Sequence, residues 1–224
     1  MLIFLLTPIA LVMSSSLWIT TISFFISYFL IYLIGCNLYH RYWSHKQIQL
    51  NKKVEYIITV LGLFSMTGDP LNYARTHRWH HMKTDTDDDP HSPIHGKWHA
   101  FVGWMFKPRI DIPLLIIKDL LKTEFKYLQT LGKFQIIIVW STIVFLGLLS
   151  VNIVAGLMLA MCCAFVFEML VNAISHSETK EIKNIGWLCY ITMSSYHGFH
   201  HAQPGVINYN DPARRLLSLI RSND

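Results

Sequence analysis

Charged residues are scarce in this sequence. Lys, Arg, Asp and Glu make up only 15% of its 224 residues, whereas hydrophobic residues make up 52%. A soluble domain carries roughly 25% charged residues, so the composition argues against an ordinary soluble protein and indicates a membrane protein. Residues 2–39 contain no charged residue at all. We interpret the whole chain, residues 1–224, as a single membrane domain, because too few polar residues remain for a separate soluble one.

Cysteine is also rare, and its spacing excludes two kinds of site. The four cysteines form neither a Cys-x-x-Cys pair nor the regular framework of a secreted disulfide-rich protein. They fall in apolar stretches, and we interpret them as packing residues in a reducing environment. The cysteines are Cys36, Cys162, Cys163 and Cys189.

Long apolar runs divide the chain into membrane segments and a polar remainder. A membrane-spanning helix needs about 20 apolar residues. The first run is short for a full crossing, but it lacks the basic start of a signal peptide and is kept as a membrane segment. The serine run Ser14-Ser15-Ser16 is expected to break the chain between this run and the next. The fold class is expected to be all-α, with about four transmembrane helices in two hairpins and a helical cap. The expected segments are residues 2–16, 18–39, 134–151 and 153–171, and the cap comprises residues 40–133 and 172–224.

Three stretches of the expected cap have recognisable patterns. Pro70 is placed to open a helix. Residues 84–93 are acidic and rich in turn-forming residues, which predicts a solvated loop rather than a calcium site, because the glycine and terminal Glu of an EF-hand loop are missing. Residues 110–133 alternate apolar and charged side chains at helical spacing, which predicts an amphipathic helix on the membrane surface.

The basic residues predict which side of the membrane the cap occupies. Fourteen of the 19 Lys and Arg residues lie between residues 40 and 133, and the other five follow residue 172. The last hairpin crosses the membrane twice, so both regions lie on one side. The positive-inside rule makes that side the cytoplasm. The net charge of +5 is thereby explained by topology and anionic lipid, and no nucleic-acid partner is expected.

Histidines in repeated patterns are the strongest functional signal. His77-Arg-Trp-His-His81 and His197-Gly-Phe-His-His201 share one spacing, and His40 and His45 form a looser pair. Positions i, i+3 and i+4 lie on one face of a helix. Imidazole is a common ligand for transition metals. His176 follows the last apolar run, with Asn172 four residues before it.

Nine clustered histidines exceed the four ligands of a structural zinc site. They indicate two metal ions with open coordination positions. Nitrogen ligands without thiolates suit iron well, while residue type alone leaves zinc and copper open. A cytoplasmic site above apolar helices favours a lipid substrate. The remaining histidines, His91, His95 and His99, are interpreted as loop or surface residues.

These motifs resemble those of the membrane fatty-acid desaturases, most closely the acyl-CoA Δ9 (stearoyl-CoA) type. The resemblance covers about residues 20–204 and rests on motifs that are weak singly and strong together. They are His40-Arg-Tyr-Trp-Ser-His45, His77-Arg-Trp-His-His81, Asp89-Pro90-His91, Val102-Gly103-Trp104, Asn172-Ala-Ile-Ser-His176 and His197-Gly-Phe-His-His201. Gly198 departs from the family pattern, which usually has Asn there.

The resemblance implies a di-iron centre that uses O2 and two electrons to introduce a double bond into a fatty acyl chain, delivered as acyl-CoA. It implies no catalytic residues beyond the metal ligands. The implied iron ligands are His40, His45, His77, His80, His81, His176, His197, His200 and His201, with Asn172 holding one iron through water.

The resemblance also implies contacts to the substrate. Arg75, Lys107 and Arg109 match positions where such enzymes carry basic residues near the CoA phosphates. Tyr73 and Thr67 match positions near the bend of the acyl tunnel. Glu168 is the only formal charge within the four apolar runs, and such a residue is usually functional. We expect Glu168 to hydrogen-bond Tyr73 or a ligand imidazole.

The expected partners are a fatty acyl substrate, the lipid bilayer and a separate electron donor (a cytochrome b5-like protein, a ferredoxin or a rubredoxin), since this sequence has no fused cytochrome b5 domain. The expected location is multi-pass, in the endoplasmic reticulum of a eukaryote or the inner membrane of a bacterium. Alternatives are a membrane di-iron hydroxylase or alkane monooxygenase, an acyl-lipid desaturase, and a non-catalytic metal-binding or transport protein.

Overall fold

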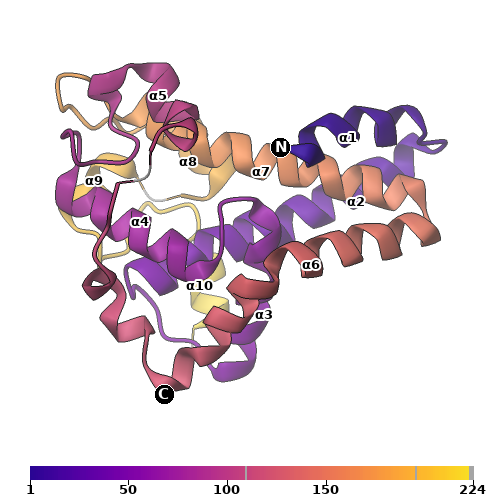
Figure 1. Cartoon of the computed structure of the whole chain (residues 1–224), viewed down its shortest axis with the longest axis horizontal. Helices are drawn as coiled ribbons and strands as arrows, with labels where there is room; N and C mark the ends of the chain where they lie inside the picture. The colour runs from indigo at the N-terminus through magenta and orange to yellow at the C-terminus, as the bar shows by residue number, and fades with distance from the viewer. Residues whose placement is uncertain (109, 195, 222–224) are drawn as a thin grey trace.

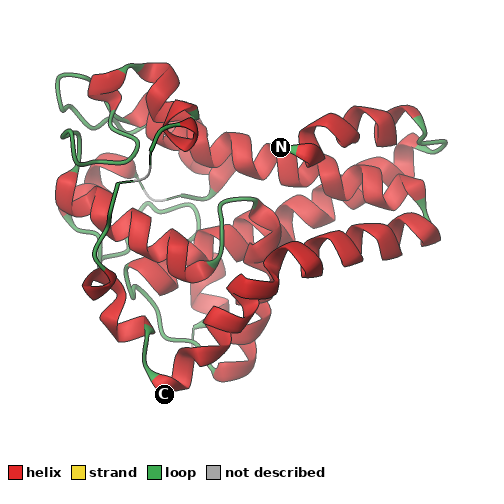
Figure 2. Cartoon of the chain, in the orientation of Figure 1, coloured by secondary structure: helices red, strands yellow, loops and turns green. Residues whose placement is uncertain are grey.

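The computed structural model describes residues 1–108, 110–194 and 196–221. Within these ranges the chain consists of helices and loops, without a strand (Figure 2). Long helices form an elongated arm, and the short helices gather at one end of this arm (Figure 1). The expected all-helical fold is confirmed for the part of the chain that is described.

Three segments are long and apolar enough to cross a membrane: Leu17–Ser44, Thr123–Leu149 and Val151–Ser175. The first comprises α2 (Leu17–Tyr28), the π-helix η1 (Phe29–Cys36) and the π-helix η2 (Tyr39–Ser44). The other two contain α6 (Lys126–Leu149) and α7 (Val151–Ser175). The first expected segment forms α1 (Leu2–Val12), an apolar helix of 11 residues, which is too short to count with the three.

Asn152 joins the tips of the two hairpins. Its Oδ1 atom accepts hydrogen bonds from the Ser14 hydroxyl and from the backbone N–H groups of Ser15 and Ser16, each at 2.9 Å. The Ser16 side chain in turn caps the start of α2. The serine run therefore breaks the chain between the first two helices, as its composition predicts, and fixes that break against α7.

The cap consists of the short helices at the end of the arm opposite the hairpin tips (Figure 1). Their bounds are α3 (Lys52–Gly62), η3 (Leu63–Ser65), α4 (Pro70–Lys83), η4 (Pro93–His95), α5 (Lys97–Phe101), η5 (Gly103–Phe106), η6 (Leu114–Leu120), η7 (Thr123–Phe125), α8 (Gly186–Thr192), α9 (His197–Ala202) and α10 (Arg214–Ile220).

The prediction of an amphipathic helix over residues 110–133 is wrong. Pro113 has an extended backbone and only short 3-10 segments follow it. Lys122 is extended as well, so a regular helix begins only at Lys126. From there α6 runs unbroken to Leu149, so the helix begins earlier than residue 134. The apolar side chains of Ile117 and Leu120 are buried within the protein core instead of facing lipid.

Gly156 allows α7 to pack directly on α2. A Cβ atom at this position would lie 2.5 Å from the Thr20 carbonyl oxygen and 2.7 Å from the Phe24 backbone nitrogen. Small residues permit such close helix contacts in membranes. The contact sets the spacing of the two helices that lead to the cap.

We predict that Gly156→Ala separates α2 from α7 and lowers the free energy of unfolding by about 1–3 kcal/mol, the usual cost of overpacking. Gly147→Ala is the matched control, because its added Cβ meets nothing closer than Val154 Cγ1 at 3.9 Å. Thermal unfolding in detergent measures both variants. Equal unfolding midpoints for the two variants would contradict the close contact.

Candidate metal centre

Four separate segments supply the clustered histidines. His40 and His45 come from η2 and the residue after it, and His176 ends α7. The second motif lies on α4, where the Asp69 side chain accepts hydrogen bonds from the backbone N–H groups of Leu71 and Asn72 at 3.0 Å. Pro70 occupies the first turn of this helix, as its sequence position predicts. The third motif forms most of α9.

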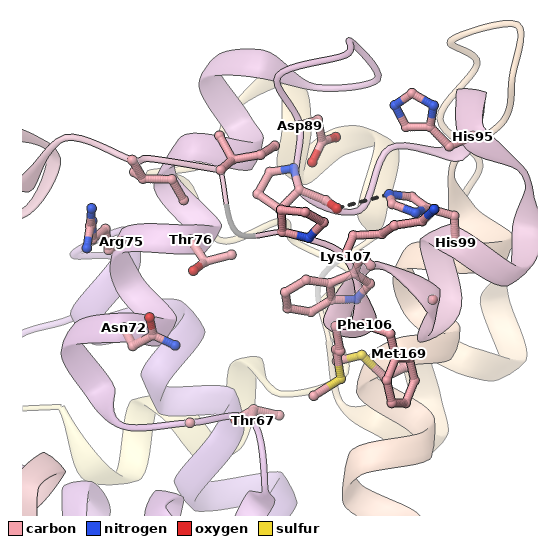
Figure 3. Close-up of a pocket in the computed structure, with 18 of the residues that line it drawn as sticks. Thr67, Asn72, Arg75, Thr76, Asp89, His95, His99, Phe106, Lys107 and Met169 are labelled. Atoms are coloured by element: carbon pink, nitrogen blue, oxygen red, sulfur yellow. Dashed lines mark hydrogen bonds between the residues drawn. The ribbon is translucent and has the colours of Figure 1, made fainter.

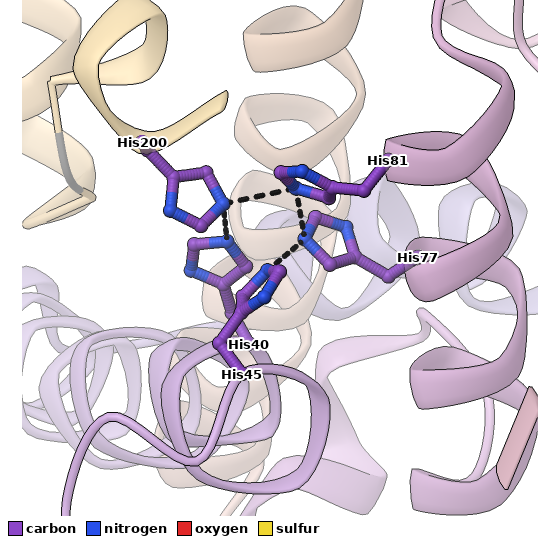
Figure 4. Close-up of side chains that lie close together, drawn as sticks. All are labelled: His40, His45, His77, His81 and His200. Carbon is purple, nitrogen blue, oxygen red and sulfur yellow. Dashed lines mark hydrogen bonds between the residues drawn. The ribbon is translucent and has the colours of Figure 1, made fainter. Parts of the chain in front are cut away.

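Five histidines form one group, in which the ligand atoms all lie within 4.8 Å of one another. Their rings point toward a common centre (Figure 4). The Nε2 atoms of His40 and His200 are 2.9 Å apart, and those of His45 and His77 are 2.8 Å apart. His81 completes the ring, 3.2 Å from His77 and 3.0 Å from His200.

The other four form a second group with the same 4.8 Å limit: His80, His176, His197 and His201. The Nε2 atoms of His176 and His197 are 2.7 Å apart, and those of His80 and His201 are 3.3 Å apart. The structure thus brings together all nine histidines singled out by the sequence, in groups of five and four.

Burial keeps these imidazoles in the form that binds metal. Together with the neighbouring His81 and the charges of Arg78 and Arg41, it lowers the pKa of His45 to about 3. Together with the neighbouring imidazoles of His176 and His91, and against the opposing charge of Asp89, it lowers the pKa of His81 to about 4. His77, His80 and His197 have pKa values well below the usual range for the same reasons. Neutral imidazoles offer a lone pair, so nine converging nitrogens fit two transition-metal ions, and iron suits such a set.

Two buried aspartates lie against histidines of the second group. Asp89 Oδ2 is hydrogen-bonded to His80 Nδ1 at 2.8 Å, whereas Asp85 Oδ1 lies 3.0 Å from His176 Nδ1 without the alignment of a hydrogen bond. Both aspartates are 1% exposed. A carboxylate hydrogen-bonded to Nδ1, as in the Asp89–His80 pair, fixes the tautomer in which Nε2 is free for metal and makes that nitrogen more basic.

These contacts correct the sequence interpretation of the acidic loop. Asp87 and Asp88 are exposed, as expected of a solvated loop, but Asp85 and Asp89 are not. His91, expected in a loop or at the surface, is buried with its Nδ1 atom 3.6 Å from Asp89 Oδ1. The sequence contained an indication of these buried aspartates, because Asp85 and Asp89 lie four residues apart, shortly after the second histidine motif.

Asn172 lies beside both groups. It lines a cavity of about 30 Å³ together with His40 and His77 of the first group and His197 of the second. A space of this size holds about one water molecule. The position agrees with the expectation that Asn172 holds a metal through water, which stays a prediction.

Arginines inside the first two histidine motifs hold the motifs in place, a role that the sequence analysis missed. Arg78 donates to the backbone carbonyls of Trp43 (2.6 Å) and Ser44 (2.9 Å), and it pairs with Asp119 at 2.6 Å. It thereby joins the second motif to the first. Partial burial raises the pKa of Asp119, but the hydrogen bonds and charges of Arg78 and Lys46 outweigh this and lower it to about 2.

Arg41 ties the first motif to the C-terminal segment. Its side chain is fully buried, pairs with Asp211 at 2.8 Å and donates to Asn37 Oδ1 at 2.6 Å. Removing one partner of such a buried pair costs about 3–5 kcal/mol, because the other charge is left without compensation.

A large cavity of about 1130 Å³ opens beside the metal groups (Figure 3). Arg75, Lys107 and Thr67, which the sequence assigned to the substrate, all line it. Arg109, assigned with them, lies outside the described residues. Glu168 and Tyr73 lie nearby, and the Tyr73 hydroxyl donates to Glu168 Oε1 at 2.6 Å. The hydrogen bond expected between these two residues is confirmed.

Fold and site together define a helical membrane protein with nine clustered histidines, in two groups that could each hold a metal ion. A family model described as fatty acid desaturase matches residues 15–216. The chain belongs to this family.

Individual relatives agree with the family match. The chain is 32% identical over 179 residues to the Delta-9 desaturase-like 5 protein of Arabidopsis thaliana, an alignment covering 73% of this chain and 59% of that protein. It is 30% identical over 181 residues to the Delta-9 acyl-lipid desaturase 1 of the same plant, covering 73% and 58%. It is also 30% identical over 177 residues to the Acyl-CoA 5-desaturase AL21 of Anemone leveillei, covering 73% and 55%. The chain thus spans less than two thirds of the length of these relatives.

We predict that Asp89→Asn weakens metal binding about 10–100-fold, the usual effect of removing a carboxylate behind a ligand histidine. Asp88→Asn is the matched control, since Asp88 belongs to the same loop but is exposed. Metal titration of the purified variants provides the measurement. Wild-type affinity in Asp89→Asn would show that the carboxylate does not support the site.

Proposed function

We propose that this protein is an oxygen-dependent desaturase that introduces a double bond into a fatty acyl chain by means of a di-iron centre. The observation that carries the proposal is the pair of buried histidine groups, five and four, next to a large cavity at the end of apolar helices. The family supports the same chemistry.

The two groups would hold one iron each. His40, His45, His77, His81 and His200 would bind the first, and His80, His176, His197 and His201 would bind the second, with Asn172 holding a water beside it. Bound iron would supply the oxidant that removes two hydrogens from adjacent methylenes, with O2 and two electrons. The protein itself excludes bulk water and fixes which methylenes lie at the site.

The large cavity is suited to a substrate with an acyl chain and an anionic head group. Apolar side chains, including Phe165 and Met169, line one part of it, whereas Arg75 and Lys107 supply positive charge in another. Guanidinium and ammonium groups bind phosphate. We therefore assign the head-group position to Arg75 and Lys107 and favour acyl-CoA over an acyl lipid, although relatives of both named kinds match the chain.

The orientation and the electron donor follow from the same proposal. The basic residues lie outside the long apolar stretches, and the positive-inside rule places the cap in the cytoplasm. Electrons would come from a separate carrier, such as a cytochrome b5-like protein, a ferredoxin or a rubredoxin.

We predict that the double variant Arg75→Ala/Lys107→Ala raises KM for acyl-CoA at least tenfold with little change in kcat. Each charge-assisted hydrogen bond to a phosphate contributes about 1.5–3 kcal/mol, and these bonds form equally in the ground state and the transition state. Lys53→Ala, an exposed residue on α3 that does not line the cavity, is the control. An unchanged KM would show that neither Arg75 nor Lys107 binds the head group.

The function itself is tested by expression in a desaturase-deficient host with analysis of total fatty acids. We predict a new monounsaturated product that disappears in His80→Ala and persists in Lys53→Ala, because Lys53 is exposed and lies outside both histidine groups and the large cavity. A new hydroxyl group instead of a double bond would identify a hydroxylase. A metal-loaded protein that forms neither product would contradict the proposal.

A further inference from the structure

A lysine outside both histidine groups holds the end of the helix that leads to His176. Lys97, the first residue of α5, donates hydrogen bonds from Nζ to the backbone carbonyls of Ala173 at 3.0 Å and of His176 at 2.7 Å. Ala173 belongs to the last turn of α7, and His176 is the residue that ends this helix. The partners are 76 and 79 residues apart in sequence, so the end of α7 depends on a contact between distant parts of the chain.

The physical chemistry of a helix end explains why a lysine suits this position. The last carbonyls of a helix have no partner within the helix, and the helix dipole places partial negative charge there. An ammonium group carries positive charge and can donate three hydrogen bonds, so it satisfies both requirements. The backbone N–H of Lys183 completes the same end by donating to the Ser175 carbonyl at 2.7 Å.

The backbone of His176 leaves the helix. Its φ of −97° and ψ of 153° are extended, so the helical geometry of α7 does not set the direction in which the chain continues. The N–H of His176 still donates to the Asn172 carbonyl at 3.3 Å, but its carbonyl is bonded by Lys97. The ring gives little further support, because Nδ1 lies 3.0 Å from Asp85 Oδ1 and makes no hydrogen bond to the described residues.

The position of this backbone matters to the second histidine group. The His176 side chain is buried, and its Nε2 atom lies 2.7 Å from His197 Nε2, within the group whose ligand atoms lie inside 4.8 Å of one another. A rotation of the backbone at His176 would carry the ring with it and move Nε2 out of this group. The first group takes no residue from α7, so it does not depend on this turn directly.

Helix α5 provides a fixed base for Lys97. It lies against the cap end of α7 (Figure 1), and its Ala100 is fully buried. Trp98 and His99, the two residues after Lys97, line the large cavity. Lys97 therefore connects the wall of the cavity to the backbone of a histidine in the second group.

We propose that Lys97 is a positioning residue, which orients His176 through its backbone and thereby sets the metal affinity of the second histidine group. The inference rests on the proposed function, because it takes this group as a metal site. Lys97 lies outside both histidine groups and does not line the large cavity, so its effect on the site passes through His176. A lysine that only supported the fold would affect both histidine groups alike.

Titration of the purified, metal-free protein with Co2+, followed by visible absorption, measures both groups without O2 or an acyl substrate. We predict that the wild-type protein binds two ions and that Lys97→Met binds one of them about tenfold more weakly, as is usual when a group that supports a ligand is lost. The other ion binds with wild-type affinity. Lys97→Arg, which can donate to both carbonyls, restores the weakened ion.

Two further variants locate the effect. In a His197→Ala background, which disables the second group, Lys97→Met has no further effect on the ion that remains. Lys183→Met is the matched control, because the Lys183 side chain pairs with the exposed Glu181 at 3.6 Å and the substitution keeps the backbone N–H that bonds Ser175. We expect Lys183→Met to bind both ions as the wild-type protein does.

Two titration results would overturn the proposal. Wild-type affinity for both ions in Lys97→Met would show that His176 keeps its position without the lysine. Equal weakening of both ions would show that Lys97 supports the fold in general and not the second group.

Acylation of lysines in the wild-type protein tests the contact even if Lys97→Met fails to fold. The Lys97 amine should react about fivefold more slowly than that of the exposed Lys53, because its hydrogen bonds to the two carbonyls must break first. Equal rates, measured by mass spectrometry, would contradict the contact and with it the proposal.

Failure of the proposed function would be distinguishable from failure of this inference. A wild-type protein that binds two Co2+ ions but forms no unsaturated product when loaded with iron would contradict desaturation and leave the role of Lys97 supported by the titrations. A wild-type protein that binds no Co2+ would overturn the metal centre, and the role of Lys97 with it.

Discussion

The convergence of nine imidazoles is the constraint on which the rest of the structure depends. Nitrogen atoms 2.7 to 3.3 Å apart cannot all carry protons, and burial lowers the pKa of rings such as those of His77 and His197 so that these remain neutral. In the absence of bound metal, this arrangement has little to stabilise it, because lone pairs face one another. The surrounding protein must therefore hold the rings in place, which is why so many buried charged groups surround the site.

Those charged groups act on the backbone as much as on the rings. Arg78 joins the second motif to the carbonyls that end the first, and Arg41 connects the first motif to Asp211 near the C-terminus. The carboxylates of Asp85 and Asp89 contact the rings of His176 and His80 directly. All of these pairs except Asp89 and His80, which are nine residues apart, join segments distant in sequence. A site assembled from four segments thus gains a defined geometry from contacts made by residues outside the two histidine groups.

Sequence patterns predicted the parts of this arrangement that depend on local spacing. The repeat of His-x-x-His-His, the break at the serines and the helix start at Pro70 are each set by neighbouring residues. Contacts between distant segments were harder to predict. The partners of Arg41 and Arg78 are 170 and 41 residues away, and nothing in the local pattern of Asp211 or Asp119 indicates them.

The helix predicted for residues 110–133 was wrong for a different reason. Their apolar spacing is helical, but Pro113 and the extended Lys122 interrupt the backbone. Ile117 and Leu120 are therefore buried in the protein, while Leu114 and Leu121 remain exposed. The loop at residues 84–93 shows the converse: its composition described the exposed Asp87 and Asp88 and concealed the two buried aspartates between which they lie. Composition averages over a segment, whereas the site depends on individual side chains.

Glu168 links the packing of the helices to the positions of the clustered histidines. A carboxyl in this apolar environment needs hydrogen-bond donors, and Tyr32 and Tyr73 supply them from the segments that carry His40 and His77. These hydrogen bonds therefore also fix the spacing of η1, α4 and α7 close to the histidines. A smaller apolar residue at position 168 would release both tyrosines, one of which stacks on His77. The rigidity of the histidine groups thus depends on hydrogen bonds made by a residue that belongs to neither group.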